Sequence, residues 1–123
     1  MNRFSYFELA TDNLEKTAAF YRDVFGWKVN KWDGPFEYWL VGNDDEGASG
    51  IYGGLMCADG GLAGTVNTIE VDDIDGAIAR AQACGGEVVL AKHAITGIGY
   101  QAYIKDNAGI VLGLHHTDTN ARE

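Results

Sequence analysis

Few side chains in this sequence combine a reactive chemistry with a position where they could act, and Glu8 is the first of them. It lies in residues 3–10, a stretch rich in aromatic residues that predicts a strand. A carboxylate among aromatic side chains favours a cationic or hydroxyl-bearing ligand, and it can act as a general base where burial raises its pKa. Glu8 is therefore the best candidate for a catalytic residue, although whether any reaction is catalysed stays open.

The other reactive side chains are limited to three histidines and two cysteines. His93 follows a lysine in a predicted loop, whereas His115 ends the last predicted strand and His116 would follow it in solvent. Cys57 and Cys84 have the spacing of neither a metal site nor a redox motif, which predicts two reduced thiols. The sequence contains no nucleophile elbow, no His-Glu-x-x-His and no phosphate-binding loop, so it lacks the corresponding enzyme signatures.

The elements that must position these side chains occur twice. Residues 14–25 predict a helix that begins after Asp12 or Asn13 and ends at Gly26, and residues 74–84 repeat this pattern sixty positions later. The predicted strands are 3–10, 27–32, 36–41 and 51–57, then 66–71, 87–91, 100–104 and 110–115. Each half therefore predicts the order βαβββ, and residues 43–50 predict an acidic, flexible loop.

This organisation predicts one α+β domain over residues 1–123. We expect two tandem βαβββ modules, at 3–57 and 65–116, joined by a glycine-rich linker at 58–64. Their sheets would form a curled mixed sheet around a cup, with the helices on the outer face. The linker would permit the modules to pair within one chain or to be exchanged between two chains.

The composition limits the kinds of partner that the protein is expected to bind. The chain has 123 residues and a formal net charge of −9, which argues against a nucleic-acid or anionic membrane surface. No apolar run approaches the roughly 20 residues of a membrane-spanning helix, and no signal-type stretch follows the first three residues. We therefore expect a cytoplasmic protein with a small-molecule ligand.

The order of elements and three segments resemble the vicinal oxygen chelate superfamily, which includes glyoxalase I, extradiol dioxygenases, methylmalonyl-CoA epimerase and bleomycin resistance proteins. The segments are residues 11–27 with Ala-Phe-Tyr-Arg-Asp-Val-Phe-Gly-Trp, residues 70–86 with Glu-Val-Asp-Asp-Ile-Asp and Gly-Gly, and residues 104–110. The resemblance covers residues 3 to 116 and implies a cup-shaped sheet and a homodimer. The superfamily hosts unrelated chemistries, so the resemblance predicts the fold and leaves the function open.

Catalytic members of the superfamily hold a divalent metal on His and Glu side chains from the first and last strands of each module. The resemblance places these positions at Tyr6, Gly54, Val66 and Gly113. None is an imidazole or a carboxylate, so we expect no metal at the usual site and no cofactor. If each of these positions is shifted by two residues along its strand, the same strand face carries Glu8, Met56, Thr68 and His115. Glu8 and His115 can both bind a metal, so a displaced metal site on these two residues stays open.

The aromatic residues favour a ligand-binding cup, because their side chains offer apolar area with a polar group at one end. In residues 36–41 either Tyr38 or Trp39 would face the cup, depending on the orientation of the strand. The predicted ligand-binding residues are Tyr6, Glu8, Trp39, Tyr52, Met56, Tyr100, Tyr103 and His115.

Three functions are compatible with this sequence. The first is a metal-free protein of the glyoxalase and bleomycin-resistance type that binds a small organic molecule in an aromatic-lined cup. The second is a lyase, isomerase or dioxygenase-like enzyme that uses a displaced divalent metal or Glu8 as general base. The third is an accessory module whose cup receives a side chain of a partner protein.

Overall fold

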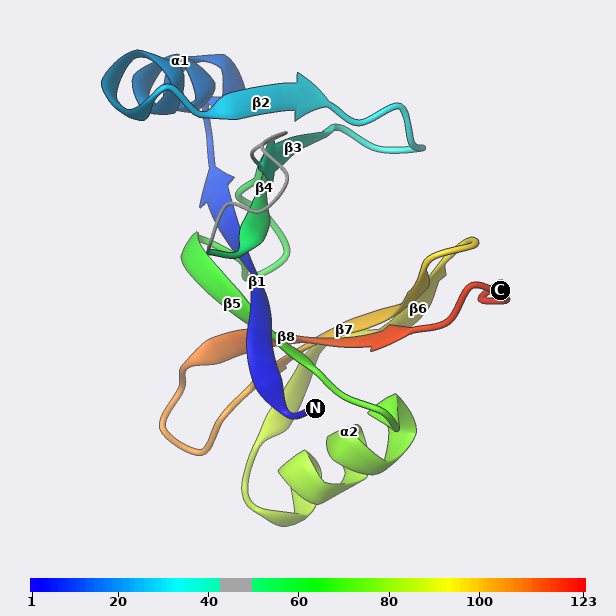
Figure 1. Ribbon diagram of the computed structural model, residues 1–123. Coiled ribbons are helices and arrows are strands. Elements are labelled where there is room, and N and C mark those ends of the chain that lie inside the picture. The colour runs from blue at the N-terminus through cyan, green and yellow to red at the C-terminus, as the bar shows by residue number, and fades with distance from the viewer. Residues whose placement is uncertain (43–49) are drawn as a thin grey trace. The chain divides into compact units, whose positions relative to one another are not determined.

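The computed structural model describes residues 1–42 and 50–123, so the loop expected at 43–50 lies outside the described residues except for its last position. These described residues form two helices and eight strands in the order βαβββ, then βαβββ (Figure 1). The elements are β1 (Arg3–Thr11), α1 (Leu14–Phe25), β2 (Lys28–Lys31), β3 (Tyr38–Gly42), β4 (Tyr52–Cys57), β5 (Gly64–Glu70), α2 (Ile74–Ala83), β6 (Glu87–Ile95), β7 (Gly99–Lys105) and β8 (Val111–Thr117). The α+β class and the repeated modules are therefore confirmed.

Local sequence signals explain where both helices begin. The side chain of Asn13 accepts a hydrogen bond from the backbone N–H of Lys16, and the side chain of Asp73 accepts one from Gly76 in the same way. Each side chain satisfies a backbone N–H group that has no partner within the helix. At the other end of α1, Gly26 adopts the left-handed conformation (φ 69°) that ends the helix.

The chain divides into two compact units, which are described separately. The N-terminal unit comprises residues 6–66, and the C-terminal unit comprises residues 1–5 and 67–123. In the N-terminal unit the strand order is β2-β3-β4-β1, and in the C-terminal unit it is β5-β8-β7-β6. Both sheets are mixed, because β1 pairs with β4 and β5 pairs with β8 in parallel, while the other pairs are antiparallel.

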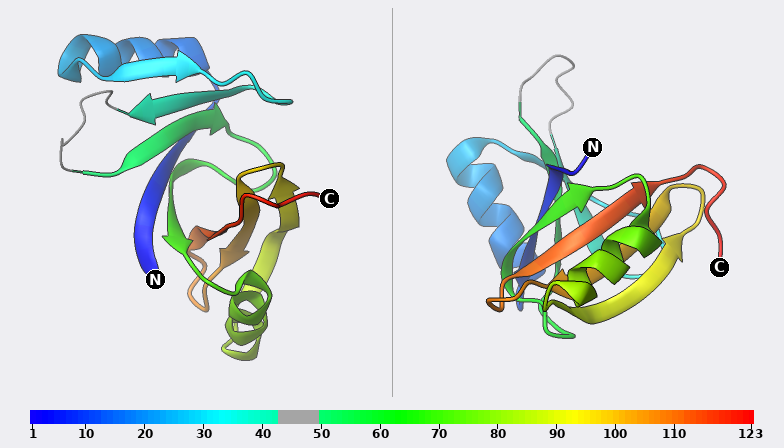
Figure 2. Two further views of the ribbon diagram at one scale, coloured as in Figure 1. Left: turned by 45° about the vertical axis from the view of Figure 1, so that its right-hand side comes forward. Right: turned by 90° about the horizontal axis from the view of Figure 1, so that it is seen from below.

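Each helix covers one face of its own sheet. In the N-terminal unit α1 contacts β2 and β4 and buries a core of Leu14, Ala18, Val29, Val41 and Leu55. In the C-terminal unit α2 lies against β6, β7 and β8 (Figure 2) and buries a core of Val71, Ile74, Ala102, Ile104 and Leu114. Since successive side chains of a strand alternate between faces, the other face of each sheet carries a separate set of residues.

The last strands of the C-terminal unit are longer than predicted. The expected strand at 87–91 extends to Ile95 in β6, with irregular register near Leu90 and again before His93. The extra residues pair with the start of β7, where Ile95 lies opposite Gly99.

In the part of the chain that the structure describes, no helix has the length and apolar character needed to span a membrane.

Candidate functional site

In the N-terminal unit, the face of the sheet away from α1 carries a buried carboxylate. The strand register puts Glu8 of β1 beside Gly54 of β4, and Gly54 beside Leu40 of β3. Glu8 is only 4% exposed. A buried carboxylate needs hydrogen-bond donors, because transfer of its charge from water is costly.

A tyrosine from the third strand supplies such a donor. Tyr38 of β3 donates its phenol proton to Oε2 of Glu8 over 2.6 Å, so its ring must cross β4 to reach β1. The crossing passes over Gly54, where a Cβ atom would lie 2.0 Å from the Tyr38 hydroxyl. Only glycine at position 54 leaves room for this contact.

A second tyrosine completes a chain of hydrogen bonds. The hydroxyls of Tyr6 and Tyr38 are 2.9 Å apart. Because a phenol has one proton and Tyr38 gives its own to Glu8, Tyr6 must donate to Tyr38. Tyr6 therefore donates to Tyr38, and Tyr38 donates to Glu8. The Tyr6 oxygen retains lone pairs that can accept a further hydrogen bond.

Burial keeps both phenols protonated. It raises the pKa of Tyr6 to about 12, with a smaller opposing effect of the hydrogen bond to Tyr38 and a further increase from the charge of Glu8. Burial, together with the nearby Glu8 carboxylate, raises the pKa of Tyr38 far above its ordinary value. The two tyrosines therefore act as neutral hydrogen-bonding groups at physiological pH.

The other predicted residues of this unit are divided between the two faces of the sheet. Tyr52 lies level with Tyr6 and is 56% exposed, and Met56 lies level with Tyr38 and is buried. Trp39 instead packs against the core beneath α1, with the guanidinium of Arg22 5.5 Å from its ring centre. Of the two alternatives in this strand, Tyr38 is the residue that joins Tyr6 and Glu8.

In the C-terminal unit, the face away from α2 carries His115 and Tyr103. Nδ1 of His115 lies 2.9 Å from Oε1 of Gln101 on the neighbouring strand. Tyr103 lies beside Gly113 and is buried. Tyr100 lies on the opposite face, where it packs in the core with α2 and has the Lys92 ammonium 4.8 Å from its ring centre.

Sequence reasoning did not select Gln101, it left Tyr38 as the alternative to Trp39, and it considered Thr68 only as a position of a displaced metal site. All three are polar groups on the sheet faces away from the helices, and Gln101 and Thr68 are buried. A polar residue between apolar neighbours, as in residues 100–104, is the one signal that could have indicated Gln101.

The described residues of the two units show no cluster of metal-ligand side chains. Among residues 1–42 and 50–123, no group of three or more His, Cys, Asp and Glu side chains is arranged to hold a metal ion. The register places Gly54 beside Glu8 and Gly113 beside Thr68, and the absence of a metal at the positions expected from the resemblance stays a prediction. Glu8 and His115 belong to different units, and a displaced metal site on the two stays a prediction.

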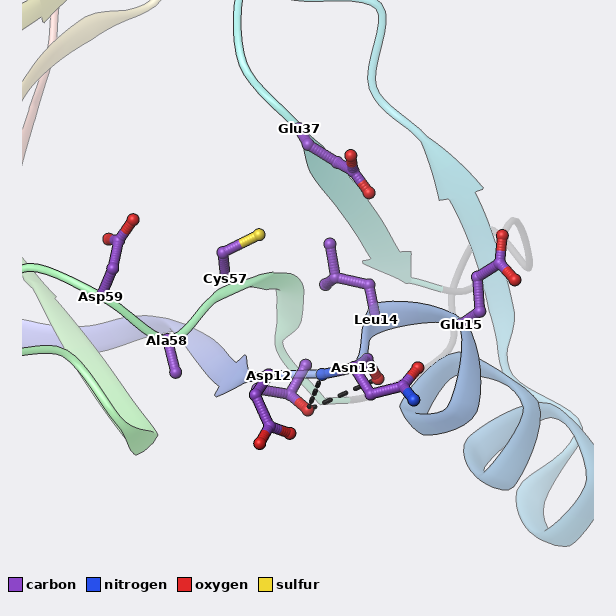
Figure 3. Close-up of a pocket in the computed structure, with 9 residues that line it drawn as sticks. Asp12, Asn13, Leu14, Glu15, Glu37, Cys57, Ala58 and Asp59 are labelled. Carbon is purple, nitrogen blue, oxygen red and sulfur yellow. Dashed lines mark hydrogen bonds between the residues drawn. The ribbon is translucent and has the colours of Figure 1, made fainter.

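An open groove of about 560 Å³ lies at the start of α1 (Figure 3). Its lining includes Asp12, Glu15, Glu37 and Asp59, all acidic. The Asn13 side chain already accepts the Lys16 N–H at this helix end, and the carboxylates repel anions. The groove therefore does not favour an anionic ligand.

Comparisons with known proteins agree with this architecture. Residues 3–41 match the family described as bleomycin resistance protein-like N-terminal. A comparison with curated proteins gave no match. Among solved structures, methylmalonyl-CoA epimerase from Mycobacterium tuberculosis is similar with a TM-score of 0.66 at 16% identity, over 94% of this chain and 87% of that one.

Two further structures extend the similarity. A methylmalonyl-CoA epimerase in complex with methylmalonyl-CoA and NH4+ gives a TM-score of 0.70 at 16% identity, over 100% of this chain and 99% of that one. A glyoxalase/bleomycin resistance protein/dioxygenase superfamily member from Vibrio splendidus 12B01 gives 0.63 at 21% identity, over 94% and 98%. The chain has the vicinal oxygen chelate fold, and the resemblance found in its sequence is confirmed.

Proposed function

We propose that this protein binds a small organic molecule on the sheet face away from α1 in its N-terminal unit, without a metal ion, through Glu8 and the phenols of Tyr6 and Tyr38. The observation that carries the proposal is the hydrogen-bonded chain that ends on a carboxylate only 4% exposed. Such a chain is costly to bury for stability alone, and polar groups of this kind concentrate at binding sites.

The chemistry of the face indicates the class of ligand. The Glu8 carboxylate is negative, and the Tyr6 oxygen accepts a hydrogen bond, so the face favours a cationic or hydroxyl-bearing group. Exposed Tyr52 and Leu40 lie on the same face and offer an aromatic ring and apolar area. An aromatic or alkyl ammonium ion and the corresponding alcohol satisfy both requirements.

A titration with matched probes tests this proposal. We expect benzylammonium and benzyl alcohol to change the fluorescence of Trp32, whose ring centre lies 6.1 Å from that of Tyr38, and benzoate to have no effect. Glu8→Gln keeps the shape of the side chain and removes its charge, so it should weaken benzylammonium about fivefold or more. Glu37→Gln makes the same change on an exposed carboxylate and should leave the affinity unchanged. Equal affinity of the Glu8→Gln variant and the wild type would refute the proposal.

The second candidate function is an isomerase in which Glu8 acts as general base. The similarity to methylmalonyl-CoA epimerase structures favours it, as does the position of a carboxylate beside two protonated phenols. Glu8 would remove a proton from the carbon next to the thioester carbonyl. Incubation with methylmalonyl-CoA in D2O, followed by proton NMR, should then show exchange of this proton, and Glu8→Gln should abolish the exchange.

We also infer that the protein forms a homodimer, as the resemblance implies. The outer surface of α1 supports this, since Phe20, Val24 and Phe25 are each more than half exposed. Light scattering should give twice the monomer mass, and Phe25→Glu should give the monomer. Ala83→Glu adds the same charge at the exposed end of α2 and serves as the control. A monomeric wild-type protein would contradict the inference.

A further inference from the structure

Three aromatic side chains gather where β2 and β3 are joined in the N-terminal unit. The backbone N–H of Trp32 donates to the carbonyl of Tyr38 over 2.8 Å, which continues the pairing of the two strands beyond Lys31 and Trp39. Since side chains alternate along a strand, Trp32 and Tyr38 lie on the face away from α1, opposite to Trp39. Phe36, in the connection itself, adds a third ring beside both.

The rings of this hairpin cluster, Trp32, Phe36 and Tyr38, are steeply inclined to one another. The ring centres of Trp32 and Phe36 are 4.9 Å apart, and each lies 6.1 Å from that of Tyr38. The interplanar angles are 61°, 78° and 89°, so no two of these rings are stacked. An edge-on contact covers a face of at most one of its two rings, so the three contacts leave ring faces that the other rings do not cover.

The hairpin cluster is anchored at two points, although it lies outside the core of its unit. Tyr38 is held by its hydrogen bond to Glu8, and a Cβ atom at Gly34 would overlap the benzene ring of Trp32, so the backbone lies against that ring. The core beneath α1 consists of other residues, and Phe36 is 52% exposed. Rings that are already held in place lose little freedom when a ligand binds.

The charges at the hairpin cluster favour a cation. Asp33 and Glu37 are exposed acidic residues of the same connection, and Tyr38 contacts the Glu8 carboxylate. The face of an aromatic ring carries a negative electrostatic potential and attracts cations. Among the described residues, the contacts between a cationic side chain and a ring involve Trp39 and Tyr100 and not the hairpin cluster, so its own lysines and arginines do not occupy these rings.

We propose that the hairpin cluster binds a quaternary ammonium group, whose methyl groups bring the positive charge to the ring faces. A primary ammonium has three N–H groups that need acceptors, and ring faces are weak acceptors. A quaternary ammonium has no N–H group, so it leaves no donor unsatisfied against the rings. This inference narrows the class of ligand, and it rests on the proposed function because Tyr38 and Glu8 belong to that site.

Choline and dimethylbutanol test the inference, because they share one shape and a carbon atom in dimethylbutanol replaces the charged nitrogen of choline. We expect choline to give a saturable shift of the Trp32 indole N–H signal in NMR and to bind about fivefold or more tightly than dimethylbutanol. Equal affinities would show that the rings act only as apolar surface, and the absence of a saturable shift would show that they bind no cation. Either result would overturn the inference.

Substitution of Phe36 tests the contribution of one ring. Phe36→Leu keeps an exposed apolar side chain and removes the aromatic face, so it should weaken choline about two- to fivefold and leave dimethylbutanol unchanged. Phe36→Tyr restores a ring and should retain the affinity for choline. Phe4→Leu makes the same change at another exposed phenylalanine and should have no effect. Unchanged affinity for choline in Phe36→Leu would contradict the inference.

Benzylammonium separates a failure of this inference from a failure of the proposed function. If Glu8→Gln weakens benzylammonium but choline binds no more tightly than dimethylbutanol, the proposed function stands and the quaternary ammonium site is wrong. If Glu8→Gln leaves the affinity for benzylammonium unchanged, the proposed function is wrong, and the inference that rests on it fails as well.

Discussion

At the scale of single residues, the chain from Tyr6 to Glu8 determines how the protein responds to alkaline pH. The pKa of Tyr6 is raised to about 12 from 10.0, so the folded state holds this proton more tightly than the unfolded state. The resulting stabilisation is complete below pH 10 and is lost as the pH rises toward 12. Urea unfolding across this range should show a smaller loss of stability in Tyr6→Phe than in the wild type. Identical pH profiles for the two proteins would contradict the raised pKa.

The same chain predicts unequal costs for removal of its two hydroxyls. Tyr38→Phe removes a hydrogen bond to a buried carboxylate and should lower the free energy of unfolding by about 1.5–3 kcal/mol. Tyr6→Phe removes a bond between neutral groups and should cost about 0.5–1.5 kcal/mol. Urea unfolding at pH 7 measures both values. A larger cost for Tyr6→Phe than for Tyr38→Phe would show that the assigned direction of hydrogen-bond donation is wrong.

The lowered pKa of His115 predicts a loss of folding stability at acidic pH, whereas the raised pKa of Tyr6 predicts a loss at alkaline pH. Its pKa is lowered in the folded state, mainly by burial, so the unfolded state binds more protons as the pH falls below the ordinary value of 6.5. Stability should therefore decrease as the pH falls from 6.5 toward the lowered pKa of the folded state. His115→Gln should reduce this decrease in melting temperature, whereas His93→Gln at the irregular part of β6 should not. An unaltered profile in His115→Gln would refute the assignment.

At the scale of elements, the last strand of each unit has a glycine where a side chain from the third strand crosses it. Tyr38 crosses Gly54 to reach Glu8, and Gln101 approaches Thr68 over Gly113. Gly54→Ala should cost about 1–3 kcal/mol of stability, because the new Cβ overlaps the Tyr38 hydroxyl. In a Tyr38→Ala background the same substitution should cost much less, and a double-mutant cycle by urea unfolding measures the difference. Additive costs would show that Tyr38 does not constrain position 54.

Elements were more predictable than the contacts between their side chains. The helix boundaries follow from Asn13, Asp73 and Gly26, which act on the backbone nearby. The choice between Tyr38 and Trp39 depends on which face of β3 meets α1, and this is settled by packing with residues distant in sequence. Local patterns therefore predicted the fold and the candidate Glu8, while the hydrogen bonds that Glu8 makes required the register of three strands.

At the scale of the whole molecule, the repeat allows the residues at matching positions of the two modules to be compared. The two modules match in their glycines at 54 and 113, which sit beside Glu8 in one unit and Thr68 in the other. A symmetric metal site needs ligands at matching positions in both modules, but here one module offers a carboxylate and the other a hydroxyl. The modules thus share the same strand pairing and differ in the polar group that lies beside this glycine.

This difference predicts the response to metals. Thermal unfolding with micromolar Zn²⁺, Ni²⁺, Mn²⁺ or Fe²⁺ should show no stabilisation, because ligand binding raises stability only where the folded state supplies a site with sufficient affinity. Glu8 and His115 alone would offer two protein ligands, whereas catalytic zinc sites use three. Stabilisation that disappears in both Glu8→Ala and His115→Ala would establish the displaced site and favour the enzyme over the binding protein. Stabilisation that survives both substitutions would place a metal elsewhere in the chain, and neither candidate function would account for it.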